Sequence, residues 1–438
     1  MSLRSFTFGC GQGATKAMIH CINEGVLDRK YCCVVNSTTK DIPLDYQNRA
    51  IVISDDPDAG CGKVRGAAKN LMINYIRNNP NVIDELISED IDYVNIMATT
   101  EGASGSGASV ILAQYIRQQI DLPVIITLIT GFESDMKGLQ NTIEYFRDIE
   151  GDFVINTVSN KRFLETSNNT FTAEKLANEY IANVFNIINM DGIENSDQNI
   201  DDTDHYKVIT NPGMMFVNDV TIDKRLKNPG QFDQMVSDAI DYSASLDFVP
   251  SATKIGVFLN ISDDNLSIID TTFSTIKKKL CANNCVPELF IHRQYIPTVP
   301  EFVRIIATGM NMPKQELEDM YAKFQSSKVS STKNDDFFAK LSEMDTSTDE
   351  VSVVSKKENK GFFEQFADNT TTNEESVVLG RNRRRRGSAS VTTNTDNGNV
   401  STPKPSKFTT ANKNTNSTSQ SKINSNKEPY SEDSIHKF

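Results

Sequence analysis

A segment rich in glycine and serine has the residue types of an anion-binding loop: residues 98–109, ATTEGASGSGAS. It follows an apolar run at residues 93–97 that predicts a buried strand, and the apolar spacing of residues 110–117 predicts a helix. Glycine permits positive φ and brings backbone N–H groups close to an anion, and the start of a helix adds partial positive charge. The segment therefore predicts a phosphate-binding turn. The alternative is a flexible loop without a chemical role.

A second glycine loop stands near the N-terminus, at residues 9–15, GCGQGAT. It lies between a predicted strand at residues 3–8 and a predicted helix at residues 16–22. Gly-x-Gly after a strand indicates, by itself, a dinucleotide-binding fold. Neither loop ends in the Gly-Lys-Ser/Thr of a P-loop NTPase, which argues against that class. Two such loops, about ninety residues apart, could hold one nucleotide from two sides.

The order of these loops resembles the tubulin/FtsZ family of GTPases, whose hallmark is Gly-Gly-Gly-Thr-Gly-Ser/Thr-Gly between a strand and a helix. Residues 101–107, EGASGSG, stand at this motif, with Glu101 and Ala103 in place of glycines. These departures resemble the branch that segregates plasmid and phage DNA, the TubZ group. The resemblance covers roughly residues 1–326. It implies an α/β fold with a Rossmann-like GTP-binding domain, a central helix with an acidic insertion, a second α+β domain and a disordered tail, at residues 1–170, 171–205, 206–326 and 327–438.

Other segments predict the elements that such a fold requires. The expected strands lie at residues 32–36, 124–129, 153–158, 254–259, 286–292 and 301–307. The expected helices lie at residues 173–188, 266–280 and 313–324. The last of these begins with a proline, which is tolerated in the first turn because its missing N–H has no partner there.

The resemblance implies that GTP, with Mg²⁺, binds on the loops of the first domain. Glu133 would accept hydrogen bonds from the ribose, and Asn160 and Asn178 would contact guanine, since an amide presents both a donor and an acceptor. Glu174 stands where the family often has an aromatic residue that stacks on the base. Lys63 and Arg65 would neutralise phosphate charge, unless they belong to a solvated turn. The expected nucleotide-binding residues are Gly9, Gly11, Gln12, Gly13, Asn36, Gly62, Lys63, Gly102, Ala103, Ser104, Gly105, Ser106, Gly107, Glu133, Asn160 and Asn178.

The family's catalytic acid lies in an Asn-x-Asp-x-x-Asp/Glu pattern on a loop that enters the pocket of the neighbouring subunit. Asn218 and Asp223 keep the outer spacing of this pattern, and the middle acid is displaced by one position to Asp219. Such an acid orients water for attack on the γ-phosphate. The resemblance thus makes these three residues the catalytic candidates. The alternative is that the two acids cap the following helix. No side chain is assigned as a metal ligand.

Composition argues against several other classes of protein. The chain has 438 residues, and 38% hydrophobic content is enough for a buried core over most of it. It lacks an apolar run of membrane-spanning length and a basic-then-apolar leader, so we expect a cytoplasmic protein without a membrane partner. The seven cysteines are an odd number and predict reduced thiols. Four histidines without a Ser/His/Asp grouping disfavour a hydrolase triad.

Charge is divided unevenly along the chain. Residues 1–326 carry a net charge of −15, residues 327–380 carry −5, and residues 381–438 carry +7. The acidic body is a poor DNA binder, while the polar composition after residue 326 is typical of disorder. The run RNRRRR at residues 381–386 would bind phosphates or an acidic surface.

From these features we expect a GTP-hydrolysing protein that assembles head to tail with copies of itself in a bacterial cytoplasm. The resemblance implies that it segregates plasmid or phage DNA through a DNA-binding adaptor, which the tail would hold. Three alternatives stay open: a cell-division filament of the same family, an NAD-binding Rossmann oxidoreductase, and a nucleotide-binding filament that does not hydrolyse.

Overall fold

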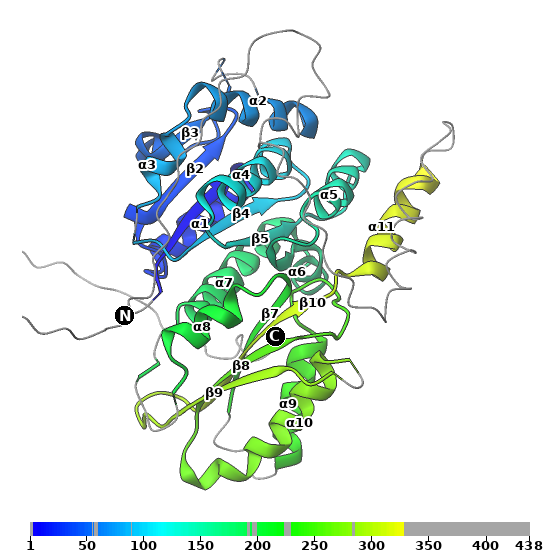
Figure 1. Ribbon diagram of the computed structural model, residues 1–438. Coiled ribbons are helices and arrows are strands. Elements are labelled where there is room, and N and C mark those ends of the chain that lie inside the picture. Colours follow the sequence, from blue (N-terminus) through cyan, green and yellow to red (C-terminus); the bar gives the residue numbers. More distant parts are fainter. Residues whose placement is uncertain are drawn as a thin grey trace, which may run out of the picture. The chain divides into compact units, whose positions relative to one another are not determined.

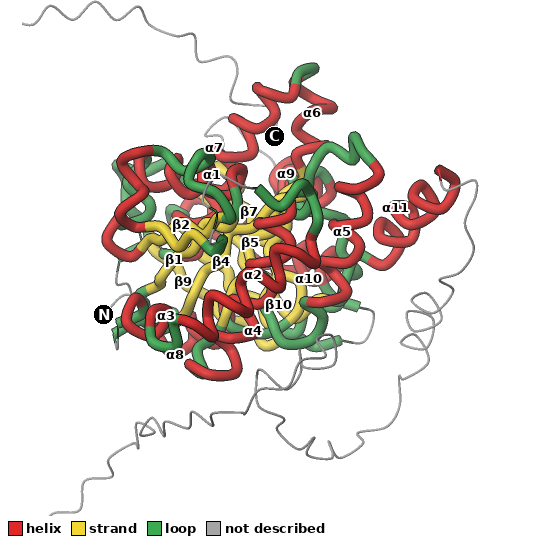
Figure 2. Tube along the Cα trace, turned by 90° about the horizontal axis from the view of Figure 1, so that it is seen from above, coloured by secondary structure: helices red, strands yellow, loops and turns green. Residues whose placement is uncertain are grey.

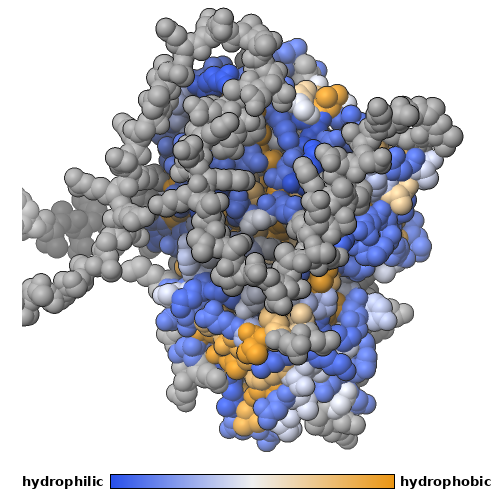
Figure 3. Space-filling model, turned by 45° about the vertical axis from the view of Figure 1, so that its right-hand side comes forward, coloured by the Kyte–Doolittle hydropathy of each residue, from blue (hydrophilic) through white to orange (hydrophobic). Residues whose placement is uncertain are grey.

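A ten-stranded sheet runs through the computed structural model, in the order β3-β2-β1-β4-β5-β6-β7-β10-β8-β9 (Figure 1). The structure describes residues 3–54, 56, 60–88, 90–190, 193–194, 199–222, 229–282 and 285–327. All of these residues belong to one compact unit. On the face shown in Figure 3 their surface is mostly hydrophilic, with apolar surface gathered toward the lower half of the view.

The first part of the sheet is parallel. Its strands are β1 (Ser5–Cys10), β2 (Cys32–Asn36), β3 (Ala50–Val52), β4 (Tyr93–Thr99), β5 (Val124–Thr130) and β6 (Val154–Ser159). The β5 sequence VIITLIT is buried throughout and consists mainly of apolar, β-branched residues, as expected of a strand covered on both faces. Because the six strands are parallel, their carboxyl ends meet at one edge of the sheet.

Helices cover both faces of these strands, as Figure 2 shows from above. One face carries α1 (Gln12–Asn23), α6 (Asn160–Ser167) and the long α7 (Thr170–Ile188). The other carries α2 (Arg65–Asn78), α3 (Val82–Leu86), α4 (Ser109–Tyr115) and α5 (Met136–Asp148). Three of these helices have N-cap residues whose side chains accept a hydrogen bond from a backbone N–H of the first turn: Asp135 for α5, Ser159 for α6 and Asn169 for α7.

The second part of the sheet is mixed. β7 (Gly213–Thr221) pairs in parallel with β6, and β10 (Phe302–Met310) runs antiparallel to both β7 and β8 (Lys254–Asn260). β9 (Glu288–Gln294) completes the edge in parallel with β8. The helices α9 (Pro229–Asp241) and α10 (Ile269–Leu280) pack on one face, and α8 (Asp202–Ile209) packs on the other. The last described helix, α11 (Lys314–Ser327), packs against α5 (Figure 1).

The expected strands and helices are confirmed, with ends that move by a few residues. The strand expected at 286–292 begins at Glu288, after Pro287, and the helix expected at 266–280 is a 3₁₀ turn (Asp263–Ile268) followed by α10. Because β6 pairs with β7, the described residues of both expected domains share one sheet. The expected tail from Lys328 onward, most of the acidic insertion before residue 199, and Asp223 lie outside the described residues. Within the described residues, no helix is both long and apolar enough to cross a membrane.

Candidate nucleotide-binding site

A pocket of about 610 Å³ lies where the parallel strands end. Its walls come from the loops that follow β1, β2, β3, β4, β5 and β6 and from one side of α7, because parallel strands direct these loops to the same edge of the sheet. The expected nucleotide-binding residues that line it are Gly11, Gln12, Gly13, Asn36, Gly62, Lys63, Gly102, Ala103, Ser104, Gly105, Asn160 and Asn178. The expected residues that do not line it are Gly9, Ser106, Gly107 and Glu133.

The two glycine loops contact each other at the floor of this pocket. Gly11 has φ +81°, and a Cβ built on it would lie 2.9 Å from the backbone nitrogen of Gly105. A Cβ on Gly105 would in turn lie 2.5 Å from the carbonyl oxygen of Thr99, at the end of β4. Both positions therefore require glycine, because the backbones of the two loops approach each other more closely than side chains allow.

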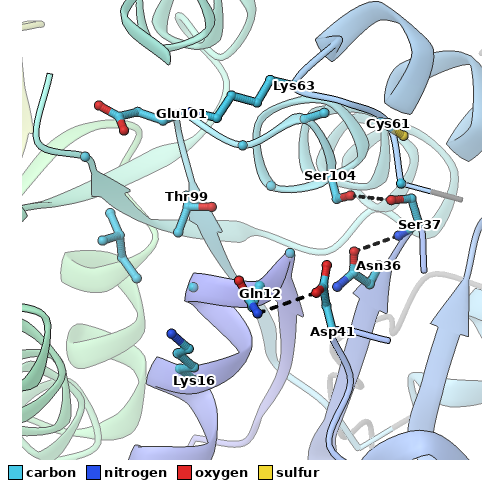
Figure 4. A pocket seen from close by; sticks show the side chains of 18 of the residues that line it. Gln12, Lys16, Asn36, Ser37, Asp41, Cys61, Lys63, Thr99, Glu101 and Ser104 are labelled. Carbon is cyan, nitrogen blue, oxygen red and sulfur yellow. Dashed lines mark hydrogen bonds between the residues drawn. The ribbon is translucent and has the colours of Figure 1, made fainter. Parts of the chain in front are cut away.

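The loop that follows β2 joins the glycine loop after β4 through hydroxyl groups (Figure 4). The hydroxyls of Ser37 and Ser104 lie 2.9 Å apart, and the Asn36 Oδ1 accepts the Ser37 N–H at 2.8 Å. Asn36 is only 2% exposed, and its Nδ2 has no hydrogen-bond partner among the described residues. A buried donor left over at a pocket wall is suited to an oxygen of a bound ligand.

The end of the glycine loop supports the pocket from behind. Ser106 is buried and donates its hydroxyl to the Gly102 carbonyl, while a Cβ on Gly107 would lie 2.5 Å from the Arg65 carbonyl oxygen. Arg65, which we expected near phosphate, is 4% exposed, donates Nε–H to the Ser106 carbonyl at 3.0 Å and forms an ion pair with Asp148. The expectation for Arg65 is therefore wrong, because its guanidinium is buried within the protein.

Lys63 lies at the wall of the pocket and is held by α5. Its ammonium group lies 2.5 Å from the Asp135 carboxylate, which the hydrogen bond from Lys63 keeps at a lowered pKa. The Nδ2 of Asn141 donates to the carbonyls of both Lys63 and Glu101, at 3.2 and 3.0 Å. One buried amide on α5 thus connects the loop between β3 and α2 with the glycine loop after β4, a link that the sequence did not suggest.

Glu101, which replaces a glycine of the hallmark motif, lies against the loop after β5. Its Oε1 accepts the Glu133 N–H at 2.8 Å, and a Cβ on Gly131 would lie 2.0 Å from its carboxyl carbon. Burial raises the pKa of Glu101. The carboxyl group therefore occupies the space that a side chain at residue 131 would need, and it fixes the loop that it touches.

The side chain of Glu133 contacts helices outside the nucleotide pocket. Its carboxylate lies 3.2 Å from the Lys161 ammonium and 2.5 Å from that of Lys323 on α11. Burial favours a higher pKa for Glu133, but the two lysines outweigh it and lower the pKa. Glu133 lines a separate cavity of about 350 Å³ beside α11, so the structure does not bring it to the expected ribose position. Gly9 is likewise outside the pocket, packed inside β1 against Met18.

The far end of the pocket has the groups that can recognise a base. Asn160 begins α6 directly after β6, and its Oδ1 has no partner among the described residues. Asn178 and Glu174 lie one turn apart on α7, and the Glu174 carboxylate is 3.7 Å from the Lys16 ammonium. The sequence reasoning did not assign the pocket-lining residues Lys16, Ser37, Asp41, Gly60, Cys61, Thr99, Glu101, Ile129, Gly131, Phe132 and Glu174 to the site. Several of them are direct sequence neighbours of assigned residues, and this adjacency could have identified them as part of the site.

The two described catalytic candidates lie in strand β7 and do not line the pocket of their own chain. The Asp219 Oδ2 lies 3.2 Å from the Arg304 Nε; burial raises the pKa of Asp219, and the arginine opposes this. Asn218 donates to the Ala239 carbonyl at 2.6 Å. Asp219 therefore does not cap α9, which begins at Pro229.

The pocket fits an anionic nucleotide better than a protein-bound metal. The described residues contain no group of three or more His, Cys, Asp or Glu side chains that could hold a metal ion. Mg²⁺ commonly keeps several waters and binds through substrate phosphates with few protein carboxylates. Asp41, which accepts a hydrogen bond from Gln12 at 3.5 Å, is a described carboxylate on the pocket wall that could contribute.

Comparison with known proteins establishes the fold. The sequence matches no protein-family model and no curated protein. Among solved structures, a GTPγS-bound protofilament of CetZ2 from Haloferax volcanii has a TM-score of 0.61 at 13% identity, with 75% of this chain and 100% of that chain covered. For a GTPγS-form protofilament of TubZ from Bacillus thuringiensis serovar israelensis the TM-score is 0.60 at 15% identity, with 78% and 93% covered. An empty FtsZ dimer from M. jannaschii has a TM-score of 0.54 at 17% identity, with 70% and 89% covered. The chain therefore has the fold of the tubulin/FtsZ superfamily.

Proposed function

We propose that this chain binds GTP in the 610 Å³ pocket, with the phosphates on the glycine loops and the guanine at Asn160 and Asn178. The observation that carries the proposal is the pair of unsatisfied polar atoms at the two ends of one pocket. The Asn36 donor ends β2 and the Asn160 acceptor follows β6, and the strands β1, β4 and β5 lie between these two in the sheet. The volume is within the range of small-molecule and cofactor sites, and a nucleotide would satisfy both atoms.

The proposal extends to self-assembly. Asp219, the described acidic candidate, does not line the pocket of its own chain. An acid from a second copy would therefore have to complete the site, and head-to-tail contact supplies such a copy. The related solved structures of CetZ2 and TubZ are protofilaments, which supports this arrangement. Because Asp219 is paired with Arg304, we propose Asp223 as the acid that orients water, with Mg²⁺ on the phosphates.

We further propose a role in the segregation of plasmid or phage DNA in the bacterial cytoplasm. The acidic body, with a net charge of −15 over residues 1–326, disfavours direct DNA contact, whereas the arginine run at residues 381–386 favours an anionic partner. A DNA-binding adaptor would therefore attach through the tail. A cell-division filament is the second candidate, because FtsZ shares the fold.

The first experiment measures GTP, GDP, ATP and NAD binding to the full chain by calorimetry, then light scattering and phosphate release with GTP. We expect GTP to bind more tightly than ATP and to trigger assembly with phosphate release. Assembly without phosphate release would favour a filament that does not hydrolyse. Binding of NAD without GTP would overturn the proposal in favour of an oxidoreductase.

A further inference from the structure

Among the described residues that line the nucleotide pocket, Phe132 is the only one with an aromatic ring. It lies in the loop between β5 and α5, two residues beyond the end of β5. Its side chain is partly buried and packs on the core formed by α1, α6 and α7. The ring is thus held by the protein on one side while the residue still contributes to the pocket wall.

Phe132 and Asn160 emerge at neighbouring strand ends. β5 and β6 are adjacent parallel strands with Thr130 paired to Ser159, so Asn160 and Phe132 follow paired residues by one and two positions. Adjacent strands lie about 4.8 Å apart. A base whose edge is hydrogen-bonded by the Asn160 amide therefore lies within reach of the Phe132 ring.

Glu174, which stands on α7 where the family often has an aromatic residue, contacts Lys16 instead of offering a ring to the base. Glu174 lies beside Lys16, with its carboxylate 3.7 Å from the ammonium, and a carboxylate offers no π surface. A flat purine in water gains free energy by stacking on an aromatic side chain, whichever element supplies that side chain. Ile129, at the end of β5, is the other large apolar residue that lines the pocket, and it has no ring.

We infer that Phe132 is the platform on which the purine base of the bound nucleotide stacks, so that the loop after β5 rather than α7 contributes the base-stacking surface. This inference rests on the proposed binding of GTP. It makes Phe132 a specificity-determining residue, because the stacking energy is gained only by ligands that carry a base. The phosphate-binding loops do not depend on it.

The sharpest test uses the absence of tryptophan from the chain, since Phe132→Trp then introduces a single tryptophan, whose fluorescence can be excited apart from that of the twelve tyrosines. We expect its fluorescence to be quenched by GTP but not by inorganic triphosphate, which carries no base. The matched control is Phe171→Trp, at a position that is 80% exposed at the start of α7 and does not line the pocket. We expect GTP to change the control much less.

A second variant separates stacking from packing. Phe132→Leu keeps apolar volume against the core but removes the ring, and we expect the Kd for GTP to rise about tenfold while the Kd for inorganic triphosphate is unchanged. Unchanged GTP affinity with an unquenched Phe132→Trp would overturn the inference and leave GTP binding intact. An equal loss for both ligands would assign Phe132 a structural role and overturn it too. If the wild-type chain binds no GTP, the proposed function fails first and this inference with it.

Discussion

Gly105 and Gly102 belong to the same loop, and the structure predicts opposite outcomes when each is replaced by alanine. A Cβ on Gly105 would lie 2.5 Å from both the carbonyl oxygen and the hydroxyl of Thr99, whereas a Cβ on Gly102 would lie 3.7 Å from its nearest neighbour, the same hydroxyl. Neither glycine has positive φ, so alanine brings no backbone strain at either position. The difference between the two variants is therefore steric.

The size of the effect follows from these distances. To reach an acceptable contact, the Gly105→Ala loop must move away from β4 by roughly 0.5–0.9 Å, and overpacking of this kind costs about 1–3 kcal/mol. Both alanines gain about 0.4–1 kcal/mol by restricting the unfolded chain, and this gain cancels in the comparison. We expect Gly105→Ala to be less stable than Gly102→Ala by about 1–3 kcal/mol in the free energy of unfolding.

Urea unfolding of the two variants beside the wild type measures this difference, and phosphate release with GTP measures its consequence. Because a shift approaching 1 Å displaces the phosphate-binding backbone, we expect phosphate release by folded Gly105→Ala to fall by roughly 10- to 100-fold. Equal urea midpoints for both alanine variants, with normal phosphate release, would refute the packing of the glycine loop on Thr99. This result would also contradict the proposed binding of the phosphates on the glycine loops.

The remaining predictions concern an ion pair, the catalytic acid and the tail. Asp148→Asn leaves the buried Arg65 guanidinium without its main counter-charge, so we expect a loss of about 3 kcal/mol in unfolding free energy at pH 7. Burial favours a higher pKa for Asp148, but Arg65 and a neighbouring lysine outweigh burial and lower the pKa. The ion pair between Asp148 and Arg65 therefore contributes its full stabilisation above about pH 4, and this contribution is lost as the pH falls through the lowered pKa. Asp223→Ala should assemble with GTP and release little phosphate, whereas Asp219→Ala should lose stability because it removes the carboxylate that lies 3.2 Å from the Arg304 guanidinium. Deletion of residues 328–438 should preserve assembly and phosphate release but abolish co-sedimentation with the adaptor–DNA complex.

The predictions for Asp148, Asp223 and the tail each have a distinct result that would contradict them. Urea curves for wild type and Asp148→Asn that differ equally from pH 3 to pH 8 would contradict the assigned direction of its pKa. Normal phosphate release by Asp223→Ala would move the catalytic acid elsewhere. A chain without residues 328–438 that still carries the complex would locate the recruiting surface on the folded residues.

The sequence by itself determined most of the parallel strands and the glycine loops that form the floor of the pocket. Alternating or continuous apolar runs predicted β1, β2, β4, β5 and β6 to within two residues at each end, and the two glycine loops between strand and helix predicted the floor of the pocket. These features are readable because they are local. Strand burial, helix periodicity and glycine turns depend on residues only a few positions apart.

Only the tertiary structure decided which way several long polar side chains point. Glu133 contacts Lys323, which lies 190 positions later, and Asp219 contacts Arg304, which lies 85 positions later, so neither could be assigned from its own neighbours. Arg65 follows a pocket loop in sequence, but its guanidinium is buried in the interior, where it forms an ion pair with Asp148 on another helix. Phe132 acquires its place beside Asn160 through the pairing of β5 with β6. A buried charge must find an opposite charge wherever the fold supplies one, and that partner is set by the packing of distant segments rather than by local sequence.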